Sequence, residues 1–297
     1  MTEELPDLPT FDPGRTRKAV RRGLYRTVTI VLAILLVLGL AATEGSRLLQ
    51  TRGDRVERMQ DVLVTAFKLY NPAYQIAGLD CCETTPWSLS FTFSASPIRA
   101  GIGFGPYGGS YYTISQDFFG RVGHLPLGND AKTPLTTALS DLGTGIRPKD
   151  DVRKVLARLP ADLRALAVVE FAKPLTDQEM RAFHEVCPTS VVYEHRPSDV
   201  PITWGDITWD RGPTEDSKCG GSLKNLRAWV KILQESDQAN LSSFGLSLDR
   251  LRKAAADGLA YAYVDDYTSI AELRKIIEDP RVRTVRLADV AFDLDHP

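Results

Sequence analysis

An almost unbroken apolar run, TVTIVLAILLVLGLAAT, extends over residues 27–43. Its length lies at the short end of what crosses a hydrocarbon core of about 30 Å as a helix. A cluster of Lys and Arg precedes the run, whereas only Arg47 and Arg52 follow it, beside Glu44. Because basic residues flanking a first span stay in the cytoplasm, the sequence predicts a single-pass cell-membrane protein with its N-terminus cytoplasmic and its C-terminal part extracytoplasmic. The topology-determining side chains are Arg15, Arg17, Lys18, Arg21, Arg22 and Arg26.

A cleaved export signal is the alternative interpretation of the same residues. Gly39 and Ala41 have the small-x-small spacing of a cleavage site, and Arg21 with Arg22 loosely matches a twin-arginine signal. The apolar core is longer than the roughly 7 to 15 residues of a typical signal and is rich in Leu, Ile and Val. We therefore favour a membrane anchor. Under both interpretations, residues 44–297 lie outside the cytoplasm.

The composition is that of a folded protein. The formal net charge is -2, hydrophobic residues make up 43% and charged residues 25%. These values indicate neither a disordered chain nor a nucleic-acid-binding surface. The expected domains are a basic, disordered cytoplasmic tail (1–26), a transmembrane helix (27–43), a membrane-proximal helix with a small β region (44–150) and an α+β domain (151–297).

The four cysteines all follow the apolar run, so an oxidising compartment would permit disulfides. Cys81 and Cys82 are adjacent and would bridge each other only in a strained ring. Cys187 with Cys219 is therefore the first candidate disulfide. The other possibility joins Cys81 and Cys82 to those two cysteines, and the sequence leaves both open.

Periodicity predicts the elements that follow the apolar run. In the first half we expect a helix at 47–70 that ends at Asn71-Pro72, a strand at 88–94, a second aromatic run at 111–119 and a short helix near 135–142. In the second half we expect strands at 163–171, 191–195, 259–264 and 282–292 and helices at 175–185, 223–234, 246–256 and 270–277. This order predicts an α+β fold of βαβ units, with a sheet covered by helices on one face.

Two stretches resemble the C-terminal domain of bacterial sigma-factor regulators, which are anti-sigma-like membrane proteins. They are ALAVVEFAKPLTDQEMRAF at 165–183 and AYVDDYTSIAELRKIIEDPRVRTVRLADVAF at 262–292. The family's first strand ends in a Lys-Pro turn, here Lys173 and Pro174. Its closing helix, loop and strand correspond to Leu273, Asp279, Pro280 and Val282, and Tyr70-Asn71-Pro72 looks like its N-terminal region. The resemblance covers about two thirds of the chain.

The resemblance implies a membrane-anchored regulator that couples an extracytoplasmic sensing domain to a cytoplasmic sigma factor, with another membrane protein as a possible further partner. The tail departs from zinc-type anti-sigma domains, because it is short and has no His/Cys zinc spacing. Leu5, Leu8 and Phe11 are the candidate partner-binding residues, since apolar side chains in a disordered tail can fold into a groove. The basic half of the tail suits anionic lipid. The alternative function is an exported or anchored binding or structural protein without a signalling role.

An enzyme is the third and weakest possibility, and we expect no cofactor, metal or small-molecule substrate. His184, Cys187, His195 and Cys219 lack a second tight ligand pair, and GIGFGPYGG at 101–109 lacks the Lys-Ser or Lys-Thr of a phosphate loop. The carboxylates at 206–216, between and beyond Trp204 and Trp209, lack a calcium-loop pattern. Asp265 and Asp266 are expected to cap a turn at a strand end. Neither Gly-x-Ser-x-Gly nor His-Glu-x-x-His occurs.

The charge asymmetry around the apolar run generates a topology prediction. A reporter fused after Pro297 should be active only outside the cytoplasm, because the basic flank holds the N-terminus inside. The full-length protein should fractionate with membranes, as measured by immunoblotting of separated fractions. A soluble product that begins near Ala42 would instead support the cleaved form.

Overall fold

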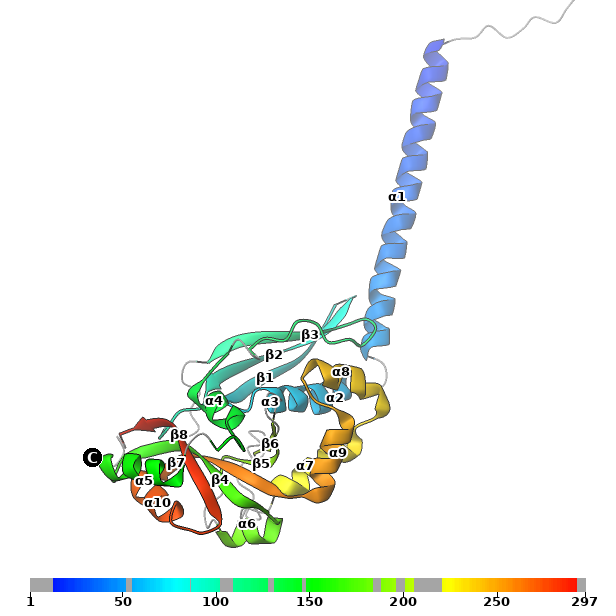
Figure 1. Cartoon of the computed structure of the whole chain (residues 1–297). Coiled ribbons are helices and arrows are strands. Elements are labelled where there is room, and N and C mark those ends of the chain that lie inside the picture. Colours follow the sequence, from blue (N-terminus) through cyan, green and yellow to red (C-terminus); the bar gives the residue numbers. More distant parts are fainter. Residues whose placement is uncertain are drawn as a thin grey trace, which may run out of the picture.

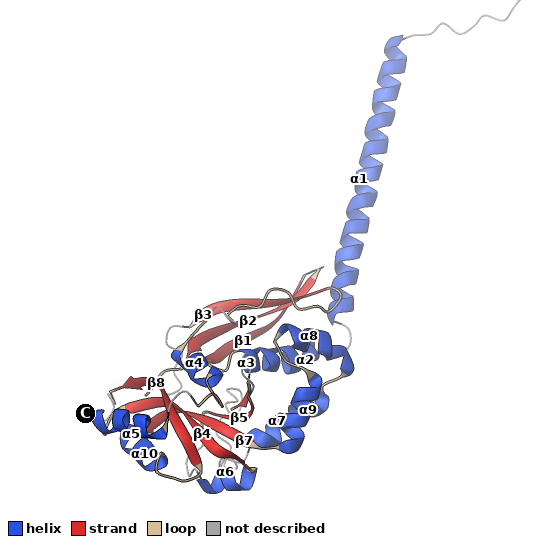
Figure 2. Cartoon of the chain, in the orientation of Figure 1, coloured by secondary structure: helices blue, strands red, loops and turns tan. Residues whose placement is uncertain are grey.

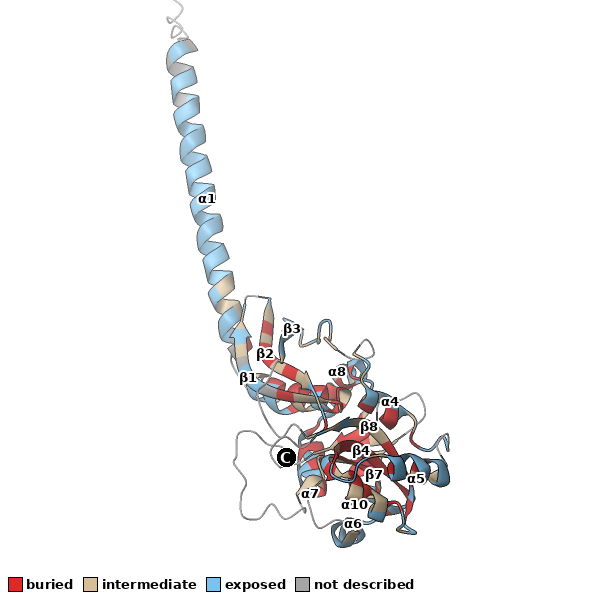
Figure 3. Ribbon diagram, turned by 90° about the vertical axis from the view of Figure 1, so that its left-hand side faces the viewer, coloured by how far each residue is buried: buried red, intermediate tan, exposed pale blue. Residues whose placement is uncertain are grey.

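The computed structural model describes residues 13–51, 55–85, 87–101, 109–127, 131–145, 148–183, 188–195, 201–205 and 221–292. Its first helix, α1 (Pro13–Thr51), projects away from the folded remainder of the chain (Figure 1). Within α1 the 29 residues Val20–Leu48 are long and apolar enough to cross a membrane, and their side chains are exposed (Figure 3). At about 1.5 Å per residue this segment exceeds a hydrocarbon core of about 30 Å.

The basic stretch before the apolar run is helical from Pro13, where a disordered tail had been predicted. Proline suits the first turn of a helix because its missing N–H would have no intrahelical partner there. Arg17, Lys18, Arg21 and Arg22 are exposed on these first turns. The predicted span at 27–43 is therefore the middle of a longer helix.

A second helical stretch carries the chain from the end of α1 into the core. It consists of α2 (Arg55–Arg58), the π-helix η1 (Met59–Val64) and α3 (Thr65–Tyr70). Met59 and Phe67, whose spacing in the sequence places them on one face of a helix, are both buried. The helix ends at Asn71, whose side-chain amide donates a hydrogen bond to the Phe67 carbonyl at 3.2 Å. The π-helical turn was not predicted.

A three-stranded antiparallel sheet packs on this helix. Its strands are β1 (Tyr74–Thr84), β2 (Ser88–Pro97) and β3 (Ser110–Asp117), in the order β1-β2-β3. Along β2 buried apolar residues alternate with Ser and Thr, as predicted, and the Phe67 and Phe93 rings lie 4.6 Å apart between their centroids. Strand β1 was missed because its pairing with β2 is interrupted by two register shifts, which break the alternation that marks a strand.

The second half of the chain forms a five-stranded sheet in the order β6-β5-β7-β4-β8 (Figure 2). The strands are β4 (Arg164–Leu175), β5 (Ser190–Glu194), β6 (Ile202–Trp204), β7 (Ala260–Ser269) and β8 (Val282–Ala291). All of their pairings are antiparallel. The helices connecting or flanking them are α4 (Pro134–Ser140), α5 (Lys149–Arg158), α6 (Asp177–Phe183), α7 (Ser222–Ile232), η3 (Glu235–Asp237), α8 (Gln238–Ser243), α9 (Leu248–Asp257) and α10 (Ile270–Ile276).

This topology differs from the predicted βαβ units. Strands β4 and β5, joined through α6, are both antiparallel to β7, so they run parallel to each other with β7 between them. Strands β7 and β8, joined through α10, enclose β4 in the same way. The strands of each unit are therefore separated by an inserted strand, which hydrophobic periodicity cannot indicate.

The five-stranded sheet is covered on both faces, where helices on one face had been predicted. Ala165, Ala167 and Val169 of β4 face a core that includes residues of α6, α7, α9 and α10. Leu166 and Val168 face the opposite side, where α4 supplies Leu135, Ala138 and Leu139. Because successive strand residues point to opposite faces, the apolar run of β4 serves both layers.

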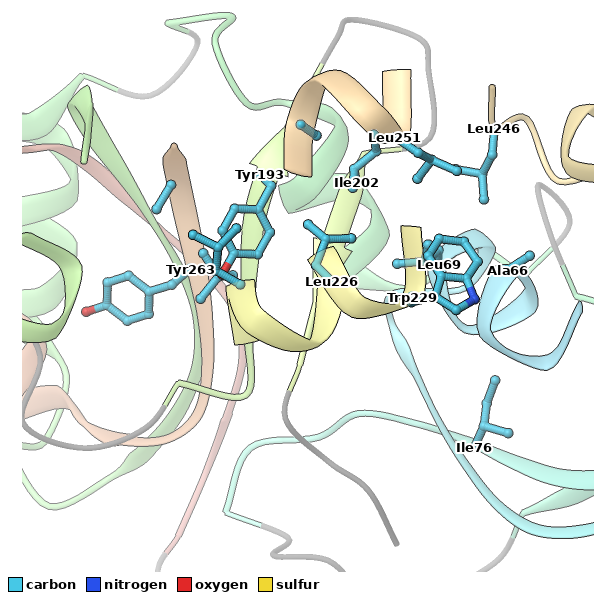
Figure 4. Close-up of a cluster of buried hydrophobic side chains, with 14 of the residues drawn as sticks. Ala66, Leu69, Ile76, Tyr193, Ile202, Leu226, Trp229, Leu246, Leu251 and Tyr263 are labelled. Atoms are coloured by element: carbon cyan, nitrogen blue, oxygen red, sulfur yellow. The ribbon is translucent and has the colours of Figure 1, made fainter. Parts of the chain in front are cut away.

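The first of these cores also contains the three-stranded sheet and the helix that precedes it. Figure 4 shows Ala66, Leu69 and Ile76 in the same cluster as Leu226, Trp229 and Tyr263. Residues before and after position 150, the expected domain boundary, therefore share one hydrophobic core.

Candidate functional site

The point where the chain passes from α1 into the core is the first candidate site, and we call its contacts at Gln50, Arg55, Arg58 and Asp61 the membrane-proximal joint. The Gln50 side-chain amide donates to the Thr85 carbonyl at 2.7 Å. This bond joins the last turns of α1 to the turn between β1 and β2. Gln50 is buried, so this contact fixes the end of α1 against the three-stranded sheet.

Arg55 holds the turn that follows β3. Its guanidinium donates to the Phe118 carbonyl at 3.0 Å, to the Asp117 carbonyl and to the Gln116 side-chain carbonyl at 3.3 Å. Partial burial lowers the pKa of Arg55, and the Asp117 carboxylate opposes this shift. An arginine keeps its charge despite such a shift, because its ordinary pKa lies so far above neutrality.

Arg58 forms an ion pair with Asp237 at 2.5 Å, and both side chains are largely shielded from solvent. The same carboxylate accepts a hydrogen bond from the Gln234 backbone N–H at 2.7 Å. Asp237 therefore connects the helix that leaves α1 to the η3 and α8 segment of the second half. A pair shielded in this way is expected to matter more than an exposed one, since solvent and salt screen it less.

The indole of Trp229, from α7, makes the fourth connection. Its Nε1–H donates to the Asp61 carbonyl, within the π-helix η1, at 2.8 Å. The Trp229 ring is buried and lies 5.7 Å from the ring of Trp204 between centroids. π-Helical turns occur often at functional positions, and this one is bound directly by a helix of the other half of the molecule.

A cleft of about 300 Å³ lies along the joint. Its two cations are both engaged within the protein, Arg55 with main-chain oxygens and Arg58 with Asp237. Among the residues that the structure describes, no cluster of three His, Cys, Asp or Glu side chains could hold a metal ion. The cleft is lined by Arg55, Arg58, Met59, Val62, Leu63, Gln116, Phe118, Phe119, Gly120, Asp237 and Asn240.

A buried charged cluster on the opposite face of the five-stranded sheet is the second candidate. Glu170 of β4 pairs with Arg286 of β8, and these residues are only 2% and 1% exposed. Arg283 approaches the other Glu170 oxygen at 3.0 Å. The Arg286 guanidinium also donates to the Asp141 carbonyl at 2.8 Å, and the Gly143 N–H donates to Glu170 at 3.3 Å.

His195 lies beside this charged cluster. Burial lowers the pKa of His195, Glu170 opposes the shift, and Arg283 and Arg286 add to it. Its ring lies so close to Gly143 that a Cβ there would come within 2.8 Å of it. Gly143 also has a φ of +78°, which glycine adopts without strain. The cluster therefore attaches the segment that follows α4 to the sheet, and this packing requires a glycine at position 143.

One signal in the sequence marks this charged cluster, and none marks the joint. Glu170 interrupts the apolar strand ALAVVEF, and a charge in a buried strand demands a partner. The partners of Gln50, Arg58 and Trp229 are distant in sequence, and no local pattern identifies them.

Several predicted site residues lie outside the described residues, namely Leu5, Leu8, Phe11, Cys187 and Cys219. The Cys187–Cys219 pair therefore stays a prediction. Cys82 of β1 is disulfide-bonded. Asp265 and Asp266 were predicted to cap a turn at a strand end, but they lie within β7 at a register shift. The Asp265 carboxylate does accept a local hydrogen bond, from the Tyr267 N–H at 3.0 Å. Burial raises the pKa of Asp266, which a 2.7 Å hydrogen bond from the Thr189 hydroxyl opposes.

Neither the protein-family models, nor the curated proteins, nor the solved structures with which the chain was compared match it. These comparisons therefore contribute nothing to the functional argument.

The charged cluster generates a stability prediction. Replacing Glu170 by Gln should lower the free energy of unfolding by about 3–5 kcal/mol, because Arg286 would keep a buried charge without its anionic partner. Chemical denaturation of the full-length protein in detergent measures the change. The control is Glu278→Gln, whose exposed partner Arg153 remains solvated, so that little change is expected. Equal effects of the two substitutions would contradict a special role for the buried pair.

Proposed function

We propose that this protein is a membrane-anchored regulator, similar to anti-sigma factors, whose extracytoplasmic domain is coupled through α1 to a cytoplasmic partner. The exposed apolar surface of Val20–Leu48 supports a single span, and the basic residues before it support a cytoplasmic N-terminus. We propose no catalytic role for the folded part.

The membrane-proximal joint is the observation that carries the proposal. Gln50 binds the β1–β2 turn, Arg55 the turn after β3, Arg58 the η3 segment and Asp61 the indole of α7. A rearrangement in either half of the folded part would therefore act on the helical segment that leads out of α1. A simple tether would need none of these contacts.

A sigma factor is the proposed partner of the cytoplasmic tail. This assignment rests on the resemblance of residues 165–183 and 262–292 to sigma-factor regulators. Leu5, Leu8 and Phe11 precede the start of α1 in the sequence, and they are the apolar side chains available to a partner groove there.

The joint can be tested with two matched tryptophan substitutions. Trp229→Phe keeps a ring in the core but removes the N–H that binds the Asp61 carbonyl, so that the hydrogen bond between α7 and η1 is lost. Sigma-dependent transcription should then move away from its wild-type level while the protein stays in the membrane. A transcriptional reporter and an immunoblot measure both.

Trp204→Phe is the control, because it makes the same chemical change in the neighbouring ring. It should leave transcription at the wild-type level. A joint without a regulatory role would give the same reporter level for both variants and the wild type.

The tail can be tested separately by placing charge on its apolar residues. Leu8→Asp with Phe11→Asp should weaken partner binding by on the order of several kcal/mol, because an unpaired carboxylate is poorly tolerated in an apolar groove. Sigma-dependent transcription should rise. A bacterial two-hybrid assay of residues 1–26 against a sigma factor encoded beside this gene measures the binding.

Thr2→Asp with Thr10→Asp adds the same charge at polar positions of the tail and should leave binding intact. If the wild-type tail does not bind and deletion of the gene leaves transcription unchanged, the regulator proposal fails. An extracytoplasmic binding protein without a signalling role then replaces it.

A further inference from the structure

Trp87 occupies an unusual position at the tip of the β1–β2 hairpin. Its side chain is 78% exposed. The Thr85 hydroxyl accepts hydrogen bonds from the backbone N–H groups of Trp87 and Ser88 at 3.2 and 3.0 Å. A large aromatic side chain is thus held in an exposed position by a structured turn.

The β1–β2 hairpin tip lies beside the last turn of α1. Gln50, which donates to the Thr85 carbonyl at 2.7 Å, is seven residues beyond Thr43, the end of the apolar run, or about 10 Å along the helix at about 1.5 Å per residue. Figures 1 and 3 both show the three-stranded sheet reaching the lower end of α1. If the hydrocarbon core ends near Thr43, Trp87 is at the outer part of the headgroup region, which extends the bilayer by several Å on each side.

Two further aromatic side chains lie at the same end of the sheet. Phe119 is 83% exposed and Phe118 is partly exposed, in the turn after β3. Asp117, which precedes them, pairs with Ser88 in the register of β2 and β3, so this turn is beside the hairpin tip. Arg55 holds it through the Phe118 carbonyl at 3.0 Å.

We propose that Trp87, Phe118 and Phe119 form an aromatic membrane-contact surface that inserts into the headgroup region of the bilayer crossed by α1. The inference rests on the proposed function only in requiring that α1 spans the membrane. Tryptophan favours the membrane interface because its ring is apolar while its N–H can still reach a polar partner. The occupant is the phospholipid bilayer itself, since this surface is continuous with the end of the apolar helix.

This contact would give the folded part a second attachment to the bilayer besides α1. With α1 alone, the folded part would be attached to the membrane at one point, next to the bond of Gln50 to Thr85. With the aromatic surface inserted, its orientation relative to the membrane is set, and the joint contacts are held at a constant depth.

Tryptophan fluorescence of the full-length protein in phosphatidylcholine vesicles tests the proposal. The acyl chains are brominated near the headgroups, since bromine quenches indole emission on contact. The emission that belongs to Trp87 is obtained as wild type minus Trp87→Phe. Most of this difference should be lost in brominated vesicles relative to unbrominated ones.

A tryptophan at the other end of the same sheet is the matched control. Tyr111 is 79% exposed and opens β3 at the end remote from Asp117, about 20 Å away at about 3.3 Å per residue. In Trp87→Phe with Tyr111→Trp, the added emission should not respond to bromine.

Vesicle flotation after alkaline extraction shows independently whether α1 is integrated. An integrated protein whose Trp87 emission is unchanged by bromine would overturn the membrane-contact surface while leaving the regulator proposal standing. Equal quenching at position 111 would also overturn it, because the whole sheet would then lie on the bilayer. A protein that fails to float would contradict the span, and with it both proposals.

Discussion

One helical path through this protein must suit two different apolar environments within a few residues, and that constraint shapes the rest of the structure. The side chains of Val20–Leu48 are exposed, whereas Met59 and Phe67 are fully buried in protein. An apolar side chain in the hydrocarbon core needs no protein partner. Outside the membrane, an apolar side chain must be covered by other protein atoms to keep it from water. Three of the four joint residues, Gln50, Arg55 and Arg58, lie between these two regions.

The position of the helix that follows the joint explains why both halves of the folded part share one large core. The helix from Arg55 to Tyr70 packs against the three-stranded sheet on one side and meets α7 and the η3 segment on another. Each half of the molecule would leave part of this helix uncovered if it folded alone. Burying this helix therefore requires both halves of the molecule. Both halves are in direct contact with it.

The two faces of the five-stranded sheet serve different purposes. One face belongs to the large core, while the other combines an apolar patch under α4 with the Glu170–Arg286 pair. Removing those charges from water is costly, and the pair persists because Arg283, the Asp141 carbonyl and the Gly143 N–H satisfy much of their hydrogen-bonding capacity. The pair fixes the chain after α4 on the sheet.

The sequence by itself determined the features whose cause is local. Apolar length and composition indicated α1, helical spacing placed Met59 and Phe67 on a buried face, and alternation identified β2. Helices begin at three of the predicted places, after Thr176, Ser247 and Ser269, and each of these hydroxyls accepts a hydrogen bond from a backbone N–H of the first turn. Each of these depends on neighbours within a few residues, where periodicity and hydrogen bonding to the adjacent backbone dominate.

Only the tertiary structure decided which strands became neighbours, that helices cover both faces of the sheet, and what the joint contacts. Inserting β7 between β4 and β5 brings together residues nearly a hundred positions apart, as the pairing of Val168 with Val264 shows. The bonds of Gln50 to Thr85, Arg58 to Asp237 and Trp229 to Asp61 likewise cross long stretches of chain. Such contacts form because burial of the shared core closes those loops, and a single sequence carries no local signature of the partner that packing selects.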